Sequence, residues 1–416
     1  MKSIRLIIVT CLSTLFASCS PVGGSFPNTT ITAPSVKATS VSTVAPTATI
    51  TSHSPSSTAT FDSILTQDVI TGDCNTLSDE DVSDQVDGIL LLRYQNNFRL
   101  LDIRNATVSN LLEQEGNVRA RLVSPDNRYL LVEVCSNGCK YILKNSTQVL
   151  DTIPVRSDWV LWQWLDNERV VILSRIEPHD VTILNPFTGD VEEFSIDLPN
   201  PYSLSQTPEE SVIPISLNPS LNKVLFYDEQ FGGRLILWSI DEEREIVSVP
   251  YNVDRSVGFG SWSPDGQKYI TSSPDNRTTT MNALFSIDRN GILTRLTNFD
   301  QNYEFANVTN PVWNPDNQHI AFWLKIGSES SSKPEDLPQF LTIMNVSSLE
   351  TKVLCQMYSI SDYPAFPVIW SPNGQQLIAN TRTDEGIVEP VLIDIAHLTR
   401  TKVSTQGNWV EGWLAP

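Results

Sequence analysis

Histidine is the side chain best suited to proton transfer near neutral pH, and the sequence contains four, His53, His179, His319 and His397. Of these, His179 falls in an expected hairpin loop, within Glu177-Pro178-His179-Asp180. The sequence has no Gly-x-Ser-x-Gly elbow, His-Glu-x-x-His motif, Cys-x-x-Cys pair or Gly-rich phosphate loop. The carboxylate pairs Glu192–Glu193 and Glu242–Glu243 fit solvated charges on outer strands. The sequence therefore predicts that the protein is not an enzyme, and that it has no catalytic residues, metal or cofactor.

Cysteine supplies further candidate sites among its six copies. Cys135 and Cys139 flank Ser136-Asn137-Gly138, an expected hairpin turn that would bring their Cα atoms to the roughly 5.5 Å that a disulfide requires. Such a bond is typical of exported proteins, and no further thiolates or histidines stand nearby to complete a zinc site. Cys74 and Cys355 either pair across the N-terminal part of the chain or stay free. The predicted disulfide is therefore Cys135–Cys139.

The first residues have the composition of a processing signal. Lys2 and Arg5 form a basic start, and Leu6–Phe16 is an apolar run shorter than the about 20 residues that a membrane-spanning helix needs. The segment Phe16-Ala17-Ser18-Cys19 resembles the cleavage site of a bacterial lipoprotein signal peptide, which implies cleavage before Cys19 and its acylation, for example with palmitate. A plain secretory signal with an incidental cysteine is the alternative. Ser20 would suit sorting to an outer membrane.

Residues 20–61 consist mostly of Ser, Thr, Pro and Ala with almost no charge. Such a segment cannot bury enough apolar surface to offset its ordering entropy, and as a coil it would span about 35–40 Å. The sequence therefore predicts a tether between a membrane anchor and a folded head. The expected division is a signal peptide at 1–18, a disordered tether at 19–61, an N-terminal extension at 62–87 and the head at 88–416.

The charge of the chain excludes some partners. It has 48 acidic and 28 basic residues, a net charge of −20, and 40% of its residues are hydrophobic, which is ample for a sheet core. Phosphate backbones and anionic lipid surfaces both require a basic face. We therefore expect no nucleic acid partner, and contact with a membrane only through the lipid anchor.

A phrase built on Trp, Ser, Pro, Asp and Gly recurs along the chain and predicts its architecture. Proline sets φ for a type I turn and ends the preceding strand, while Asp, Asn or Gly tolerate the positions that follow. A short apolar run follows each copy. The copies recur every 41 to 57 residues, the length of one propeller blade, at Val123–Asn127, Trp164–Asn167, Leu217–Ser220, Ser261–Gly266, Val312–Asn317 and Ile369–Gly374.

A second half-repeat follows each copy, for example Ala283–Asp288 before Gly291–Leu296, so that each blade has four expected strands. A seventh second half lies within Gly88–Leu112 and has no Pro-Asp turn before it. Its missing inner strand is expected in Asn408–Pro416, whose Gly-Trp-Leu-Ala-Pro is similar to the repeated phrase. The sequence predicts an all-β, seven-bladed propeller of four-stranded antiparallel blades, with the first blade closed by the C-terminal strand. Six or eight blades are the alternatives.

These motifs resemble those of the TolB-type, WD-repeat-like β-propeller family, whose hallmark is Trp-Ser-Pro-Asp-Gly followed by a strand of the Ile-Ala-Phe kind. Trp262–Gly266 matches in full, and Trp313–Phe322 differs by Asn for Ser and Asn for Gly. The resemblance covers residues 88–416. Two copies lack the Pro-Asp core, and six blades is the commoner number in TolB itself. The resemblance implies a fold, and it implies little about function because the motif residues serve turns and packing.

Three functions fit such a head. The favoured one is a membrane-tethered, monomeric module of the cell envelope, outside the cytoplasm, that binds a protein or peptide. The second is a carbohydrate or small-ligand binder that uses the central funnel, with Tyr202 or Phe231 as exposed aromatics. The third is a propeller-borne hydrolase, which resembles the propeller half of prolyl-oligopeptidase-type peptidases without their hydrolase domain.

Overall fold

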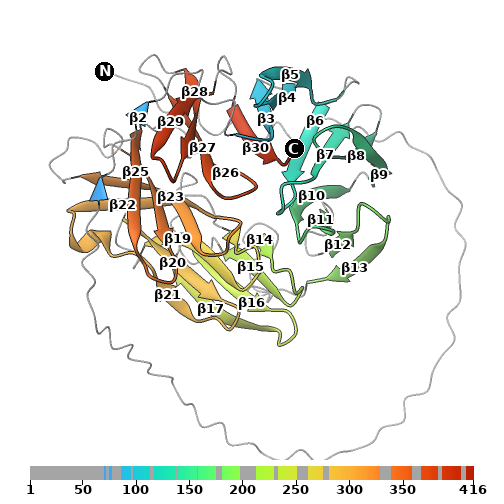
Figure 1. Cartoon of the computed structure of the whole chain (residues 1–416). Coiled ribbons are helices and arrows are strands. Elements are labelled where there is room, and N and C mark those ends of the chain that lie inside the picture. The colour runs from blue at the N-terminus through green and yellow to red at the C-terminus, as the bar shows by residue number, and fades with distance from the viewer. Residues whose placement is uncertain are drawn as a thin grey trace, which may run out of the picture. The chain divides into compact units, whose positions relative to one another are not determined.

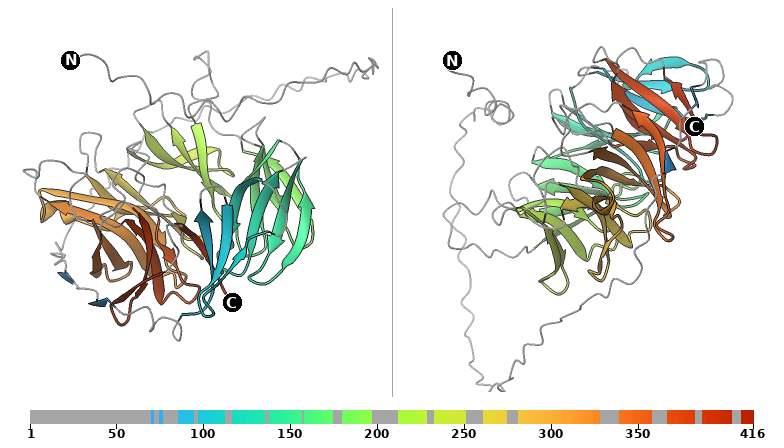
Figure 2. Two further views of the ribbon diagram at one scale, coloured as in Figure 1. Left: turned by 90° about the horizontal axis from the view of Figure 1, so that it is seen from above. Right: turned by 90° about the vertical axis from the view of Figure 1, so that its left-hand side faces the viewer.

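The computed structural model describes the parts of the chain that form the predicted head. The described residues are 70–71, 75–76, 86–94, 97–112, 117–135, 138–156, 158–174, 180–196, 212–228, 233–250, 261–274, 281–327, 339–357, 367–382, 387–403 and 409–416. They all belong to the second of two units, 1–64 and 65–416. In this second unit, seven sheets follow one another around a ring (Figures 1 and 2). The protein is an all-β, seven-bladed propeller, and the predicted fold class is confirmed.

Each blade has four antiparallel strands, ordered from the centre of the ring outward. Blade 1 contains β30 (Trp409–Leu414), β3 (Ile89–Tyr94), β4 (Asn97–Asp102) and β5 (Thr107–Asn110). Blade 2 contains β6 (Asn117–Val123), β7 (Leu130–Cys135), β8 (Cys139–Lys144) and β9 (Val149–Pro154). Blade 3 contains β10 (Trp159–Trp164), β11 (Val170–Ser174), β12 (Asp180–Leu184) and β13 (Val191–Ser195).

The remaining blades repeat this order. Blade 4 contains β14 (Val212–Leu217), β15 (Lys223–Asp228), β16 (Arg234–Ser239) and β17 (Arg244–Pro250). Blade 5 contains β18 (Ser261–Trp262), β19 (Lys268–Pro274), β20 (Asn282–Asp288) and β21 (Leu293–Arg295). Blade 6 contains β22 (Phe305–Trp313), β23 (His319–Gly327), β24 (Gln339–Asn345) and β25 (Thr351–Met357). Blade 7 contains β26 (Ile369–Trp370), β27 (Gln376–Arg382), β28 (Val388–Asp394) and β29 (Thr399–Lys402).

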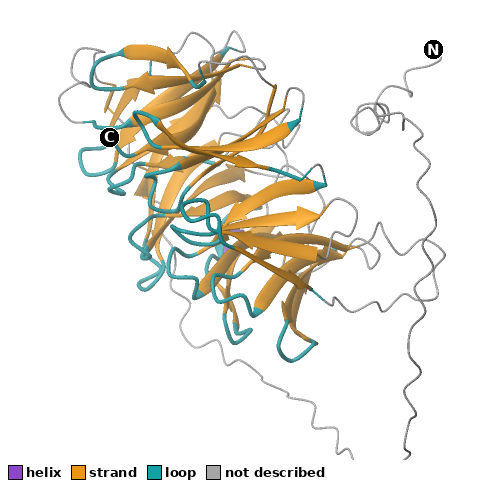
Figure 3. Ribbon diagram, turned by 90° about the vertical axis from the view of Figure 1, so that its right-hand side faces the viewer, coloured by secondary structure: helices purple, strands orange, loops and turns teal. Residues whose placement is uncertain are grey.

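Strands and connections make up nearly all of the described structure (Figure 3). One 3-10 helix, η3 (Phe299–Gln301), lies in the connection between blades 5 and 6. The described elements include no helix whose length and hydropathy would let it span a bilayer.

The Ser-Pro-Asp phrase forms the turn between the inner and second strands. In blade 5, the Ser263 hydroxyl donates to Asp265 Oδ1 at 2.6 Å and accepts from the Lys268 amide at 3.0 Å. Gly266 then adopts a φ of +67°, and Asn127 and Asn317 adopt a φ of 60° at the same place in their turns. This left-handed conformation is open to Gly and tolerated by Asn, which explains why these two residues end the phrase.

The hydrophobic core is divided among the blade interfaces. The described residues form seven hydrophobic clusters, and each contains residues of two neighbouring blades. In three copies of the repeated phrase, the tryptophan also links neighbouring blades through its indole N–H. Trp164 donates to the Leu122 carbonyl, Trp313 to the Ser261 carbonyl and Trp370 to the Val312 carbonyl, each on the inner strand of the preceding blade. In these copies the tryptophan therefore joins neighbouring blades by a hydrogen bond.

The two ends of the propeller sequence meet in blade 1, where β30 pairs with β3 (Figure 1). Trp413 is fully buried, and its indole donates to the Asp87 carbonyl at 3.1 Å. The Ala415 amide donates to the Asn127 carbonyl of the turn in blade 2 at 2.7 Å. The C-terminal strand therefore closes the ring as the sequence predicted.

Two short strands that precede blade 1 in the sequence add to the rims of the last two blades. β1 (Ile70–Thr71) pairs in parallel with β25, and β2 (Asn75–Thr76) pairs in parallel with β29. Both lie within the predicted N-terminal extension at 62–87. These pairings place the chain along the outer edges of blades 6 and 7 before it enters blade 1, on the opposite side of those blades from the inner strands.

Candidate functional site

The two faces of the propeller differ in the lengths of their connections. On one face, which we call the turn face, inner strands end and lead into the short Ser-Pro-Asp turns, for example residues 263–267 and 314–318. On the other, which we call the loop face, inner strands begin, and the connections include residues 196–211, 251–260, 328–338 and 358–368. Binding residues are found disproportionately on loops held by a rigid scaffold. The loop face is therefore the better candidate for a binding site.

The turn face, in contrast, is linked by hydrogen bonds from one turn to the next. The Asp126 amide donates to Asn167 Oδ1, and the Asp265 amide donates to Asn317 Oδ1, both at 3.0 Å between neighbouring blades. Asn314 Nδ2 donates to the Gly374 carbonyl of the next blade, also at 3.0 Å. The polar groups of these turns are thus used in holding the ring together.

A polar hollow of about 270 Å³ opens at the loop-face end of blade 3. All four strands of the blade contribute to it, together with the residues that lead into β10. Within β12 and β13, Thr182 lies opposite Glu193 and Asp180 opposite Ser195, so their side chains share one face of the sheet. The lining consists of Arg156, Asp158, Trp159, Ser174, Asp180, Val181, Thr182, Glu193 and Ser195.

The Arg156 guanidinium occupies one side of this blade 3 hollow. Its Nε and Nη2 atoms lie 3.2 and 3.0 Å from the two carboxylate oxygens of Asp158, which is the paired geometry that arginine favours. Its Nη1 atom is 3.5 Å from Glu193 Oε1. The guanidinium carbon also lies 5.5 Å from the centre of the Trp159 ring, within the range of a cation–π contact. Two carboxylates and an aromatic ring thus surround a cation.

The other side of the hollow is acidic and hydroxylic. The Ser195 hydroxyl donates to Asp180 Oδ1, and Thr182 and Ser174 add hydroxyl groups to the lining. The Glu193 side chain is 60% exposed, whereas the Asp158 side chain is only 15% exposed. This arrangement offers hydrogen-bond acceptors and negative charge to a ligand that enters from solvent.

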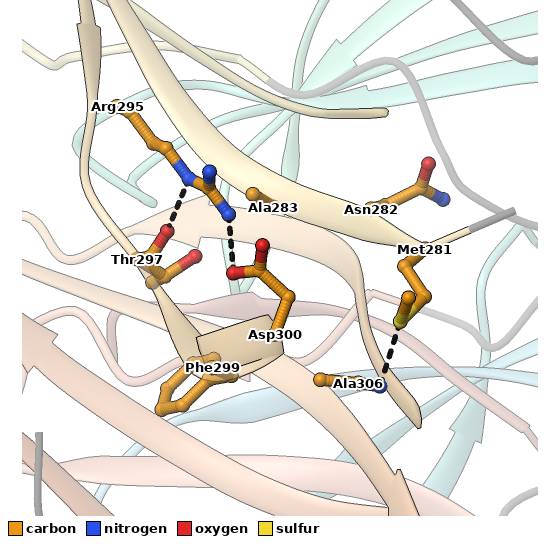
Figure 4. A pocket seen from close by; sticks show the side chains of 8 residues that line it. All are labelled: Met281, Asn282, Ala283, Arg295, Thr297, Phe299, Asp300 and Ala306. Atoms are coloured by element: carbon orange, nitrogen blue, oxygen red, sulfur yellow. Dashed lines mark hydrogen bonds and ion pairs between the residues drawn. The ribbon is translucent and has the colours of Figure 1, made fainter. Parts of the chain in front are cut away.

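A second, much smaller pocket lies at the junction of blades 5 and 6 (Figure 4). Arg295 donates through Nε to the Thr297 carbonyl at 2.7 Å and pairs with Asp300. The Ala306 amide donates to the Met281 sulfur at 3.5 Å. With a volume of about 30 Å³, this pocket has room for a water molecule but not for a side chain or a sugar. We therefore assign it no binding role.

Cys135 and Cys139 lie directly opposite each other, at the end of β7 and the start of β8, on the loop face. Their sulfur atoms are bonded at 2.03 Å. Their Cα atoms are 4.1 Å apart, closer than the sequence-based expectation, because directly opposed residues of an antiparallel pair approach each other closely. Glu133 lies within 4.8 Å of both sulfurs. Since the sulfurs are bonded to each other, this trio offers no thiolates to a metal.

We predict that Cys135 and Cys139 are also oxidised in the native protein. Peptide mapping without reductant should yield one peptide that contains both residues and resists alkylation. Because the closed loop is short, the serine double variant should lose only a small part of its stability. The same mapping after reduction, in which both residues should be alkylated, is the control. Recovery of both Cys135 and Cys139 as alkylated thiols would contradict this prediction.

Among the residues that the structure describes, the other candidates from the sequence do not gather into a site. His319 begins β23 and lies 2.6 Å from Asp316 Oδ2. Burial acts to raise the pKa of Asp316, but hydrogen bonds from the His319 ring and from two backbone amides, with the charge of His319, bring this pKa below its ordinary value. His397 lies 2.9 Å from Asp394 Oδ1 in an outer turn. The residues that fall outside the described ones are Cys19, His53, Cys74, His179, Tyr202 and Phe231.

The sequence alone does not lead to the blade 3 hollow. In the sequence, Glu193 fits a solvated charge on an outer strand. No motif singles out Arg156, Asp158, Trp159 or Asp180. The available signal is Arg-Ser-Asp-Trp at residues 156–159, which places two opposite charges beside an aromatic residue at the start of an inner strand. These residues can be recognised as part of a site only in the folded blade, where Asp180 and Glu193 line the same hollow.

Comparison with known proteins supplies no family for this chain. No family model matches it, and no curated protein matches it. Among solved structures, TolB from Acinetobacter baumannii is similar at 14% identity over 78% of this chain and 81% of that chain, with a TM-score of 0.38. The putative TolB from Agrobacterium tumefaciens is similar at 15% identity over 69% and 95% of the two chains, with a TM-score of 0.37.

An oligogalacturonate lyase from Vibrio parahaemolyticus is also similar, at 12% identity over 76% of this chain and 86% of that chain, with a TM-score of 0.49. The TolB proteins indicated by the Trp-Ser-Pro-Asp-Gly phrase are thus among the structures that resemble this chain. The class that the fold itself defines is the seven-bladed β-propeller with a short-turn face and a long-connection face.

Proposed function

We propose that the protein is a non-catalytic interaction module of the cell envelope, which binds a protein or peptide at its loop face. In this proposal Cys19 is acylated and anchors the chain to a membrane, residues 19–61 form the tether, and the propeller lies outside the cytoplasm. The predicted signal at residues 1–18 supports the anchor.

The observation that carries the proposal is the contrast between the two faces. The turn face consists of short turns whose polar groups bond to the neighbouring blade, as Asn167 and Asn317 do. The loop face has the long connections and the blade 3 hollow, which is lined by charged side chains and a tryptophan. A macromolecular partner needs a broad surface, and the longer connections of the loop face give that face more chain with which to contact a partner.

A carbohydrate or small polar ligand is the second candidate. The observation that favours it is the blade 3 hollow, where Trp159 lies beside carboxylates and hydroxyls, because an aromatic ring with a few polar groups is a common pattern in small-ligand sites. A glycan array with the full chain distinguishes the two candidates. Binding to a defined glycan, together with no protein partner, would favour this alternative.

Crosslinking from two matched isoleucines tests which face binds the partner. Ile387 precedes β28 on the loop face and is 51% exposed, while Ile292 precedes β21 on the turn face and is 61% exposed. A photo-crosslinking amino acid at position 387 should yield a discrete adduct in native membranes, identified by mass spectrometry, and the same substitution at 292 should not. Equal adducts at both positions, or an adduct at 292 alone, would refute the assignment of the binding face.

The anchor is tested separately with Cys19→Ala. This variant should move from the membrane fraction to the soluble fraction, because a polar tether has no other means of attachment. The Cys355→Ala variant is the control for loss of a cysteine as such. A Cys19→Ala protein that still sediments with membranes would refute the lipid anchor while leaving the loop-face interaction to the crosslinking experiment.

A further inference from the structure

The blade 3 hollow has a lining that selects for one kind of chemical group. We infer that it binds a cationic side chain, a lysine or arginine presented by the partner protein or peptide. This inference rests on the proposed function and adds to it the chemistry of the contact. Three features of the hollow carry it: the guanidinium already held there, the balance of charges in the lining, and the room that is left.

Arg156 shows how the hollow accommodates a cation. Its guanidinium pairs with both oxygens of Asp158 and lies over the Trp159 ring. Proteins recognise guanidinium groups by two contacts: a carboxylate that lies in the plane of the guanidinium, and an aromatic ring that lies against its face. Arg156 itself is 59% exposed, so it covers only part of this acidic surface. Asp180 and Glu193 add further carboxylates to the lining, and the Glu193 side chain is 60% exposed.

The charges of the lining are not balanced. Among the lining residues that the structure describes, Arg156 is the one cation, against the three carboxylates of Asp158, Asp180 and Glu193. The closest contact between Arg156 and Glu193 is 3.5 Å, and Asp180 is bonded to the Ser195 hydroxyl rather than to a cation. A second positive charge would therefore neutralise carboxylates that Arg156 leaves unneutralised. An anionic ligand would be repelled by the excess of carboxylates in the lining.

The hollow has room for one inserted side chain of a partner, and it is too small for a larger part of a folded protein. Its volume of about 270 Å³ is close to the lower end of small-ligand pockets, which hold about 300–1,000 Å³. It can therefore admit one long side chain, and the net charge of −20 on the whole chain would draw a basic peptide toward it. Thr182 and Ser195 provide hydroxyl acceptors for the remaining donors of an arginine or lysine.

Calorimetric titration of the full chain with paired peptides tests this inference. The probe is an acetylated, amidated Gly-Arg-Gly peptide, and the reference is the same peptide with citrulline, which keeps the shape of arginine and lacks its charge. The arginine peptide should bind more tightly, and its affinity should fall as salt is raised. Equal affinities for the two peptides would overturn the inference.

Neighbouring glutamates provide a matched pair of variants. Glu192 and Glu193 follow each other in β13 and point to opposite faces of the sheet, and only Glu193 lines the hollow. Both Glu193→Gln and Glu192→Gln remove one negative charge. Glu193→Gln should weaken binding of the arginine peptide about fivefold, the effect of one half-exposed ion pair, whereas Glu192→Gln should leave it nearly unchanged. Equal losses would assign the effect to overall charge and refute the site.

Arg156→Gln separates a cationic ligand from any other kind. Because Arg156 competes for the same carboxylates, its replacement should tighten binding of the arginine peptide several-fold. A loss of binding would mean that Arg156 contacts the ligand directly, as it would with a carboxylate or a sugar, and would overturn the inference. Circular dichroism and thermal melts confirm that each variant is folded. If the hollow fails these tests while Ile387 still crosslinks a partner, the proposed function stands and only its chemistry is wrong.

Discussion

A chain that ends at Gln406 should lose its cooperative thermal transition. The truncation removes β30, which is the inner strand of blade 1, and exposes the edge of β3. It also removes Trp413, which is fully buried between blades 7 and 1. Loss of such a ring from a core costs about 3–5 kcal/mol, and the total stability of most domains is only about 5–15 kcal/mol. Thermal melts followed by circular dichroism measure the outcome.

A pair of point variants checks that the effect comes from packing and not from chain length. Trp413→Ala should lower the melting temperature strongly, while Trp409→Ala should have a smaller effect, because Trp409 at the start of β30 is only partly buried. An unchanged cooperative transition in the truncated chain would mean that the ring is stable without β30. Closure by the C-terminal strand would then contribute little to folding.

Replacement of Asn380 should be the most destabilising change of a single polar residue at the ring closure. Asn380 lies in β27 of blade 7 and is 5% exposed. Its Nδ2 donates to the Val410 carbonyl at 2.8 Å, and its Oδ1 accepts from the Val410 amide at 2.9 Å. The side chain therefore satisfies both backbone groups of one residue in β30. Asn380→Ala leaves both buried and unsatisfied, at a cost of about 1–3 kcal/mol each.

Two further variants sharpen this second prediction. Asn380→Asp should destabilise at least as much as Asn380→Ala, because a carboxylate cannot donate to the Val410 carbonyl and its charge would be buried. Asn290→Ala, in an exposed turn of blade 5, is the control and should have little effect. Free energies of unfolding from denaturant titrations measure all three. If Asn380→Ala matches Asn290→Ala, the amide does not support the closure.

Blade number and strand order were predictable from the sequence because the turns that define them are local. The Ser-Pro-Asp phrase forms its turn through contacts between residues at most five positions apart, such as Ser263 with Asp265 and Lys268. Proline and the left-handed glycine or asparagine fix the backbone within the same few residues. The six copies of the phrase mark six blades, and the second half-repeat within Gly88–Leu112 marks the seventh.

The contacts between blades were not predictable, because they join residues that are distant in the sequence. Trp370 is part of a recognisable copy of the phrase, but nothing local identifies the Val312 carbonyl as the acceptor for its indole. Asn380 gave no signal at all, since its partner Val410 is aligned with it only when blades 7 and 1 are side by side. The pairing of β1 with β25 and β2 with β29 has the same origin, because two-residue strands have no periodicity to detect.

The candidate site depended on the tertiary structure for the same reason. The sequence placed Asp180 in an expected hairpin loop and Glu193 among solvated charges on outer strands, and no motif in it singled out Arg156, Asp158 or Trp159. Only the register of β12 with β13 places Asp180 beside Ser195 and Glu193 beside Thr182, facing the guanidinium. Turn chemistry is decided by neighbours along the chain and can be read from them, whereas a binding hollow is decided by strand register and blade packing, which bring its residues together only in the folded ring.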